Sequence, residues 1–413
     1  LISNVISSQE IINDTLQTTR QDLDEVIVKG IRAKFSSPIS FTNVDKQDLK
    51  SKNLGQDLPI LLNFLPSVVT TSDAGAGIGY TGIRIRGVSP QSTNITINGI
   101  PFNDPESMGT FWVNLPDFSS SIESLQVQRG VGTSTNGSGA FGASINILTD
   151  IVSDQPYAEL SSSFGSYNTL KNTIKFSTGK INDYFELSGR LSKIDSDGYV
   201  DRAYSDLKSY FIQGAYTNGS TLIKAISFGG HEKTYQAWDG LSMDQVLENR
   251  RQNPLTYENE IDNYKQDHFQ LHWNEKINNY WSFNLGLNYT DGRGYFEQYK
   301  EDDDINTYGG IVKSDIDSNE NETGTTDLIR RRWLDNNFYV LNSSINYIKD
   351  KIDLTLSSSY SSYVGDHYGE VIWARSLSNT GEIRDRYYEG LGEKKDLSFF
   401  AKLLYSINEK TEL

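Results

Sequence analysis

The stretch GIRIRGVSPQSTNITINGIPFNDPESMGTFWVNLPDFSSSIESLQVQRGVGTSTNGSGAFGASINILT, residues Gly82–Thr149, decides the fold. Its apolar residues alternate in short runs, which glycine-rich segments separate. This alternation predicts four short strands: Ile83–Ile85, Asn94–Gly99 with an Asn-Gly turn at its end, Ile122–Arg129 and Ala143–Thr149. Upstream, the mixed three- and four-residue leucine spacing of Lys46–Leu65 predicts two short helical turns. We therefore expect a small α+β domain with a thin core.

Beyond residue 155 the sequence changes to ten segments of about ten residues in which apolar and polar side chains alternate. This pattern predicts strands with one apolar and one polar face. Two sets of residues on these segments show the apolar spacing: Phe211, Gly214 and Tyr216, and Ile352, Leu354 and Leu356.

The connections between these segments alternate between tight and long. The tight ones are Gly179–Asp183, Thr217–Ser220, Glu275–Tyr280 and Ile348–Lys351, and the long ones are Ile194–Ser205, His231–Asp262, Asp291–Leu334 and Gly365–Glu393. Such sorting is typical of an antiparallel transmembrane β-barrel, with periplasmic turns and external loops. A soluble β-sandwich is the alternative, but it would not sort its connections in this way.

The composition supports a membrane wall and disfavours several other classes. The net charge is −16, which disfavours a nucleic-acid binder, because such a protein needs a basic surface. Hydrophobic content is 36% while aromatic content is 12%, as expected for strands with one apolar face and aromatic girdles. The sequence has no cysteine, so disulfides and thiolate metal sites are excluded. Asp315 and Asp317 resemble the start of a calcium loop, but Glu320 occupies the position that requires glycine.

The Gly82–Thr149 stretch carries an ordered set of motifs that resembles a known family. These are Ile85-Arg86-Gly87, Asn98-Gly99-Ile100-Pro101, the run Ile122–Gly130, and Ala140-Phe141-Gly142-Ala143-Ser144-Ile145-Asn146-Ile147. They are similar to the plug domain of TonB-dependent outer-membrane transporters. Asn98, Val131 and Ala143-Ser144 depart from the usual Asp, Pro and Gly-Gly, although asparagine also tolerates the turn conformation.

The resemblance implies an α+β plug followed by a barrel of about 22 strands, of which this chain holds about ten. It implies a monomeric barrel in the outer membrane of a Gram-negative bacterium, in contact with lipid, and no enzyme activity. Because ten strands leave two open edges, we expect the chain to be part of a protein of ~700 residues.

The resemblance also divides the chain into four parts. Residues 1–22 are expected to be a signal-peptide remnant and a periplasmic tail, 23–30 an energy-coupling box, 31–152 the plug, and 153–413 the first part of the barrel. Within the second part, the extended segment Leu23-Asp24-Glu25-Val26-Ile27-Val28 is expected to add a strand to a TonB-type partner. It would otherwise be the first strand of the plug.

Position in the family pattern suggests which residues contact a ligand. We expect ligand contacts from the plug apex and the external loops: Tyr80, Phe102, Asn103, Asp104, Phe111, Trp112, Tyr235 and Trp238. The alternative is that these aromatic residues pack the plug against the barrel. Arg86 and Arg129 match plug arginines that form a latch with glutamates of the barrel wall, since a buried charge needs a partner.

The function that follows is active import of a scarce solute, most often a ferric siderophore or another iron chelate in this family. No cofactor and no metal site is expected. Cobalamin, haem or an oligosaccharide are alternative solutes. A surface receptor or adhesin that does not transport is the rival from another class, and a soluble hydrolase is the most distant reading.

Overall fold

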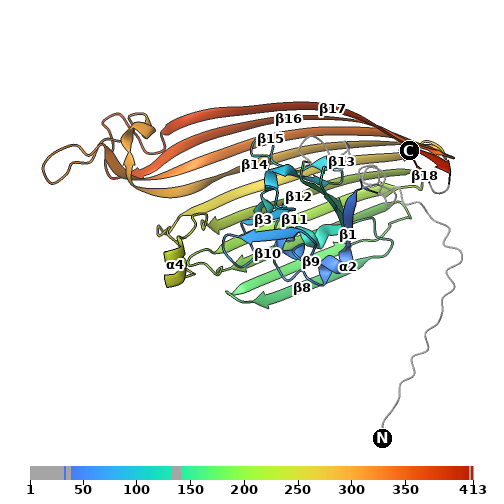
Figure 1. The fold of residues 1–413 in the computed structure, drawn as a ribbon, viewed down its shortest axis with the longest axis horizontal. Coiled ribbons are helices and arrows are strands. Elements are labelled where there is room, and N and C mark those ends of the chain that lie inside the picture. The colour runs from blue at the N-terminus through green and yellow to red at the C-terminus, as the bar shows by residue number, and fades with distance from the viewer. Residues whose placement is uncertain (1–31, 34–38, 132–140, 409–410, 413) are drawn as a thin grey trace, which may run out of the picture.

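The computed structural model describes residues 32–33, 39–131, 141–408 and 411–412. The predicted energy-coupling box, residues 23–28, lies outside the described residues. Two units are present: a small mixed domain at the N-terminal side and a large curved sheet that follows it (Figure 1).

The small domain, here called the plug, is built on a five-stranded sheet with the order β1-β6-β7-β4-β5. Strands β4 and β7 pair in parallel and the other neighbours are antiparallel. Strands β2 and β3 form a separate hairpin. The elements are β1 (Ser40–Asp45), α2 (Lys46–Lys50), α3 (Leu58–Leu61), β2 (Val68–Ser72), β3 (Thr81–Ile85), η2 (Pro90–Ser92), β4 (Thr93–Ile97), β5 (Ile100–Pro101), η3 (Trp112–Asn114), η4 (Phe118–Ser121), β6 (Ile122–Arg129) and β7 (Ala143–Thr149).

The predicted plug elements are confirmed. The Asn-Gly turn between β4 and β5 illustrates how the local sequence determines one of them. Asn98 and Gly99 have φ angles of 54° and 81°, the left-handed region that an Asn-Gly hairpin turn requires. The Asn98 side chain also accepts hydrogen bonds from the N–H and hydroxyl of Thr149 at 3.0 and 3.1 Å. This turn therefore ties β4 to the end of β7.

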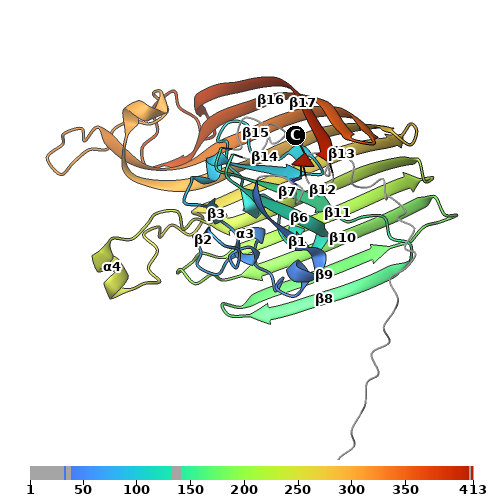
Figure 2. The ribbon, with the colours of Figure 1, turned by 45° about the vertical axis from the view of Figure 1, so that its right-hand side comes forward.

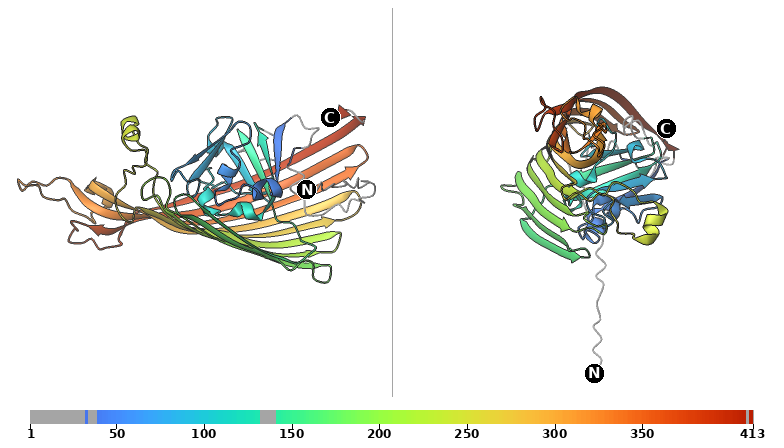
Figure 3. Two further views of the ribbon diagram at one scale, coloured as in Figure 1. Left: turned by 90° about the horizontal axis from the view of Figure 1, so that it is seen from below. Right: turned by 90° about the vertical axis from the view of Figure 1, so that its left-hand side faces the viewer.

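The large sheet contains the ten predicted strands, each antiparallel to the next in sequence order (Figure 2). They are β8 (Tyr157–Gly165), β9 (Thr169–Ser177), β10 (Phe185–Ser196), β11 (Ser205–Thr217), β12 (Thr221–Tyr235), β13 (Ile261–Lys276), β14 (Trp281–Asp304), β15 (Thr325–Lys349), β16 (Ile352–Ala374) and β17 (Arg386–Asn408). A two-residue strand, β18 (Thr411–Glu412), pairs with the end of β17. Figure 3 shows this sheet curving around one side of the plug.

Two of the long loops were predicted too long, because β14 to β17 extend further than the sequence pattern predicts. The loop expected at residues 291–334 is reduced to 305–324, and the one expected at 365–393 to 375–385. A small apolar cluster of Tyr308, Leu328 and Val371 joins these strand ends and the short helix η6 (Ile305–Tyr308), so the extensions are stabilised by packing. The loop between β12 and β13 carries a further helix, α4 (Met243–Glu248).

The two faces of the sheet differ as predicted, with apolar side chains outside and polar ones inside. On β9, Ile174 is 54% exposed on the outer face, while Thr173 and Lys175 are buried on the inner face. Phe211 was placed on the wrong face: it is 1% exposed and packs against the plug, while Gly214 and Tyr216 face outward. A two-residue period places odd and even positions of β11 on opposite faces, so these three cannot share one. Within the described ranges, no helix is long and apolar enough to cross a membrane.

Candidate functional site

The plug and the inner face of the sheet share one apolar core. Phe211, Ile226 and Phe228 of the wall belong to the same buried cluster as the plug residues of β4, β6 and β7. The rings of Phe118 in the plug and Phe228 in the wall lie 5.2 Å apart, centre to centre. The plug is therefore packed against the wall rather than resting loosely beside it.

A buried carboxylate of the plug, Asp117, holds two cations of the wall. Its Oδ1 lies 2.7 Å from Nζ of Lys171 on β9, and its Oδ2 lies 3.4 Å from Nη1 of Arg190 on β10. Thr173 donates a further hydrogen bond to Oδ2 at 2.6 Å. Burial alone would raise the pKa of Asp117, but the charges of Arg190 and Lys171 outweigh it and hold the pKa below its usual range. This group is an ionic seat for the plug that the sequence did not reveal.

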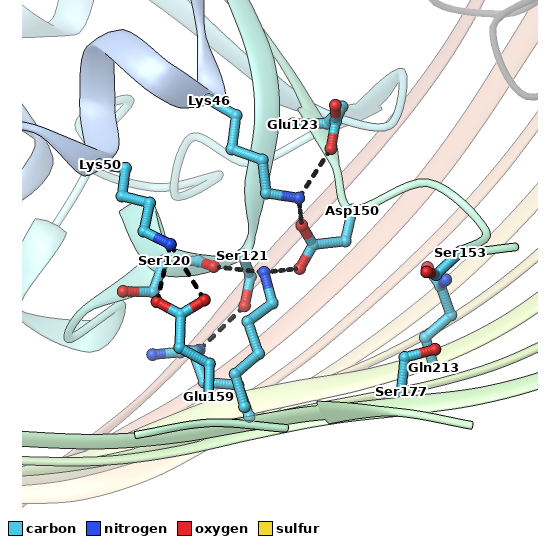
Figure 4. Close-up of polar contacts among 12 residues, drawn as sticks. Lys46, Lys50, Ser120, Ser121, Glu123, Asp150, Ser153, Glu159, Ser177 and Gln213 are labelled. Atoms are coloured by element: carbon cyan, nitrogen blue, oxygen red, sulfur yellow. Dashed lines mark hydrogen bonds and ion pairs between the residues drawn. The ribbon is translucent and has the colours of Figure 1, made fainter. Parts of the chain in front are cut away.

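A second ionic contact joins the last plug strand to the wall (Figure 4). Asp150 lies 2.8 Å from Nζ of Lys46 in the plug and 2.6 Å from Nζ of Lys175 on β9. Lys46 also pairs with Glu123 at 2.9 Å. Burial would raise the pKa of Asp150, but Lys175 and Lys46 together lower it. At the rim, Lys50 and Glu159 form a more exposed pair at 2.9 Å.

The plug apex, the loop that follows β5, is anchored to the wall by polar contacts. Glu106 accepts a hydrogen bond from the Tyr363 hydroxyl at 2.8 Å and lies 2.6 Å from Nε2 of His367, both on β16. Deeper in the interface, the Asn98 amide donates to Gln270 on β13 at 3.1 Å. Asn342 on β15 donates to the carbonyl of Gly99 at 2.8 Å.

Beside these anchors lies a cavity of about 270 Å³ between the plug apex and the inner faces of β12 to β16. Five predicted ligand contacts line it: Tyr80, Phe102, Asn103, Asp104 and Phe111. The wall contributes further lining residues beyond the eight predicted contacts, among them Glu232, Asp262, Tyr264, His268, Asn288, Asn336, Tyr363 and His367. The sequence pattern predicts strands β12 and β13 and their polar inward positions. It does not distinguish an inward polar residue that lines a cavity from one that only faces the plug.

The other three predicted contacts, Trp112, Tyr235 and Trp238, are not among the residues that line the cavity. Trp112 is 3% exposed in the shared core, because the turn η3 points it away from the cavity that its neighbour Phe111 lines. The Tyr235 hydroxyl donates to the carbonyls of Leu255 and Tyr257, and so braces the loop after β12. Trp238 borders the cavity, since its ring lies 5.4 Å from that of Tyr80.

The two predicted latch arginines, Arg86 and Arg129, lie close together in the plug. Arg129 donates to the carbonyl of Pro66 at 3.1 Å and to the Thr42 hydroxyl at 2.8 Å, both within the plug. Burial and the nearby charge of Arg86 lower the pKa of Arg129. Two neighbouring cations would be stabilised by an acidic partner. The latch to glutamates of the wall stays a prediction.

Residues 33–144 match the family model of the TonB-dependent receptor plug domain. A vitamin B12 transporter, BtuB, of Vibrio vulnificus is 28% identical over 47% of this chain and 30% of its own length. A probable TonB-dependent siderophore receptor, PirA, of Acinetobacter baumannii is 26% identical over 37% of this chain and 22% of its own length. The ferrienterobactin receptor of Escherichia coli is 24% identical over 43% of this chain and 26% of its own length. Each match thus spans less than a third of the relative.

Solved structures share the fold over most of this chain. A complex of FpvAI with pyocin S2 superposes with a TM-score of 0.66 and 11% identity, covering 90% of this chain and 51% of FpvAI. The siderophore receptor PiuA of Acinetobacter baumannii gives 0.61 and 13%, covering 92% and 57%. Residues 33–144 therefore match the plug domain of TonB-dependent receptors, and the described chain shares its fold with these solved structures.

Proposed function

We propose that the protein imports a scarce solute, a ferric chelate, across the outer membrane. The solute binds in the cavity at the plug apex, and a TonB-type periplasmic protein supplies energy by pairing with Leu23–Val28. The observation that carries this proposal is the position of the cavity, which is lined by both the plug and the wall. A ligand there contacts both bodies at once, so its binding changes the balance of the contacts that hold them together.

The names of the relatives support iron as the cargo. Two of those described above are receptors for siderophores or ferrienterobactin, and one is a vitamin B12 transporter. Cobalamin is therefore the second candidate solute. In this proposal the cavity does no covalent chemistry. Its aromatic faces and polar groups select the ligand, and the periplasmic partner supplies the energy for transport.

The decisive experiment measures binding and uptake separately. Cells whose chromosomal receptor is replaced by the full-length protein or by its Val26→Pro variant are given a panel of radiolabelled ferric chelates and labelled cobalamin. Proline cannot donate a strand hydrogen bond, so the variant should bind its ligand at the cell surface but fail to import it. Val26→Ala, which keeps the backbone donor, is the matched control and should import normally.

The outcomes separate the rival functions. Uptake that survives Val26→Pro would remove energy coupling and favour a receptor that does not transport. Uptake of cobalamin and of no iron source would replace the proposed cargo.

A further inference from the structure

The charge of the cavity is unusual for a site that takes an iron chelate. Four carboxylates line it: Asp104, Glu106, Glu232 and Asp262. Among the described residues, no lysine or arginine lines it. His367 also lines the cavity, but its Nε2 atom already lies 2.6 Å from the Glu106 carboxylate. Many ferric chelates are polyanions, and this lining would repel them.

Two of these carboxylates are buried without a cation. Glu232 on β12 and Asp262 on β13 are 1% and 8% exposed. Thr234 donates to Glu232 at 3.0 Å and Tyr80 donates to Asp262, but both donors are neutral hydroxyls. In the described part of the chain, neither carboxylate forms an ion pair. Asp117, buried as deeply, has both Lys171 and Arg190 as counter-charges.

The neutral polar groups of the cavity present hydrogen-bond acceptors as well. Asn288 donates its amide to Thr290 at 3.1 Å and Asn336 donates to the Tyr264 hydroxyl at 3.3 Å, so the carbonyl oxygens of both remain without a partner. The Oδ1 atom of Asn114 has no partner either. Asn288 and Asn114 are 5% and 7% exposed, so water does not replace the missing donors freely. Buried acceptors without donors are costly, and a donating ligand would satisfy them.

A bare metal ion does not fit this set of ligands. In the described ranges, no three side chains of His, Asp or Glu are placed to hold a metal ion together. Aromatic rings line the same cavity as the carboxylates, among them Tyr264, Tyr295 and Phe296. Aromatic faces attract organic cations such as ammonium and guanidinium groups.

We propose that the solute presents a cationic, hydrogen-bond-donating organic group, an ammonium or a guanidinium, to Glu232 and Asp262 at the wall side of the cavity. This inference rests on the proposed function and narrows its substrate to chelates that carry such a group. The group replaces the missing counter-charge of the two carboxylates, and its N–H donors reach the free amide oxygens. An anionic chelate of the same metal and size is excluded by the same lining.

The test uses chelates that differ in charge and not in metal. The probes are a linear trihydroxamate ferric chelate with a free terminal amine, the same chelate with that amine acetylated, and a tris-catecholate ferric chelate, which is a polyanion. Binding to the full-length protein in outer-membrane vesicles is measured for each. The free-amine chelate should bind at least about tenfold more tightly than its acetylated form.

Three variants locate the effect. Glu232→Gln and Asp262→Asn keep the size of the side chains but remove their charge, and each should abolish the preference for the free amine. Asp267→Asn is the matched control, because Asp267 lies on the same strand as Asp262 but pairs with Lys265 on the outer face. It should keep the preference.

Each other outcome overturns the inference. Equal affinity of the wild-type protein for the free-amine and acetylated chelates does so without reference to any variant. Tighter binding of the tris-catecholate chelate refutes the cationic subsite while leaving iron uptake as the function. Binding of none of the three chelates, when labelled cobalamin does bind, removes both this inference and the proposed iron cargo.

Discussion

The Nζ atom of Lys171 on β9 lies 2.7 Å from Oδ1 of Asp117 in the plug, and both side chains are shielded from solvent. Together with Arg190, this pair places one anion of the plug between two cations of the barrel wall. None of these three residues lines the cavity. The contact therefore holds the plug in place from outside the proposed ligand site.

Asp117→Asn should weaken the seat strongly, because the amide leaves two buried cations without a counter-charge. Loss of one partner from a buried ionic group costs about 3–5 kcal/mol. The free energy of unfolding of the detergent-solubilised protein, followed by urea denaturation, measures the effect. Glu159→Gln, which breaks the exposed pair with Lys50, should change it by less than about 1 kcal/mol. Equal effects of the two variants would show that Asp117 is not a seat.

Gly230 on β12 should tolerate no larger side chain. A Cβ atom there would lie 2.7 Å from both the carbonyl oxygen of Asn114 and Cδ of Pro116, so Gly230→Ala pushes the plug away from the wall. We expect a destabilisation of about 1–3 kcal/mol and faster proteolysis of the plug. Gly214→Ala on the neighbouring strand is the control, because nothing lies within 4 Å of its Cβ position. Proteolysis of both variants at the wild-type rate would contradict this close approach.

Asp57 should make the plug less stable as the pH rises. Burial raises its pKa to about 8 from the usual 3.8, although hydrogen bonds from Thr81 and Gly79 oppose this. Between about pH 4 and pH 8 the folded plug keeps this proton while the unfolded chain has lost it. Unfolding then releases a proton, so the free energy of unfolding falls by up to about 1.4 kcal/mol per pH unit and levels off above the folded pKa.

Asp57→Asn replaces the titrating carboxyl group with a neutral amide. The free energies of unfolding of the variant and the wild type are compared by urea denaturation at pH 5, 7 and 9. The free energy of unfolding of the variant should rise relative to that of the wild type from pH 5 to 7 and again from pH 7 to 9. Parallel stability profiles for the two proteins would mean that Asp57 does not titrate in this range.

The sequence was sufficient for four of the plug strands, β3, β4, β6 and β7, and for the ten barrel strands, because these depend on local patterns. The Asn98-Gly99 turn and the two-residue alternation fix strand ends and faces without any knowledge of distant residues. Ion pairs are different: Asp117 and Arg190 are separated by 73 positions, and only the folded chain shows that they meet.

For the same reason, the sequence predicts most of the plug side of the cavity but not its wall side. Its plug side comes largely from one continuous segment, Pro101–Phe111, whereas its wall side combines separate inward positions of five strands. Even within the plug, the adjacent residues Phe111 and Trp112 are 44% and 3% exposed, because a short 3₁₀ turn begins at Trp112. The strand extensions of β14 to β17 were missed because their packing partners lie on neighbouring strands.

In the proposed function, this protein transports a solute by moving a plug that is seated against the barrel wall. Asn98 in the plug and Gln270 in the wall are joined by a 3.1 Å hydrogen bond, and the sequence contains no cysteine. The most direct measurement is the uptake of labelled ferric chelate by cells that carry Asn98→Cys and Gln270→Cys, before and after treatment with a short thiol cross-linker. The account predicts that cross-linked receptors still bind the chelate but no longer import it, while each single variant does both. Import at the wild-type rate by fully cross-linked receptors would contradict it.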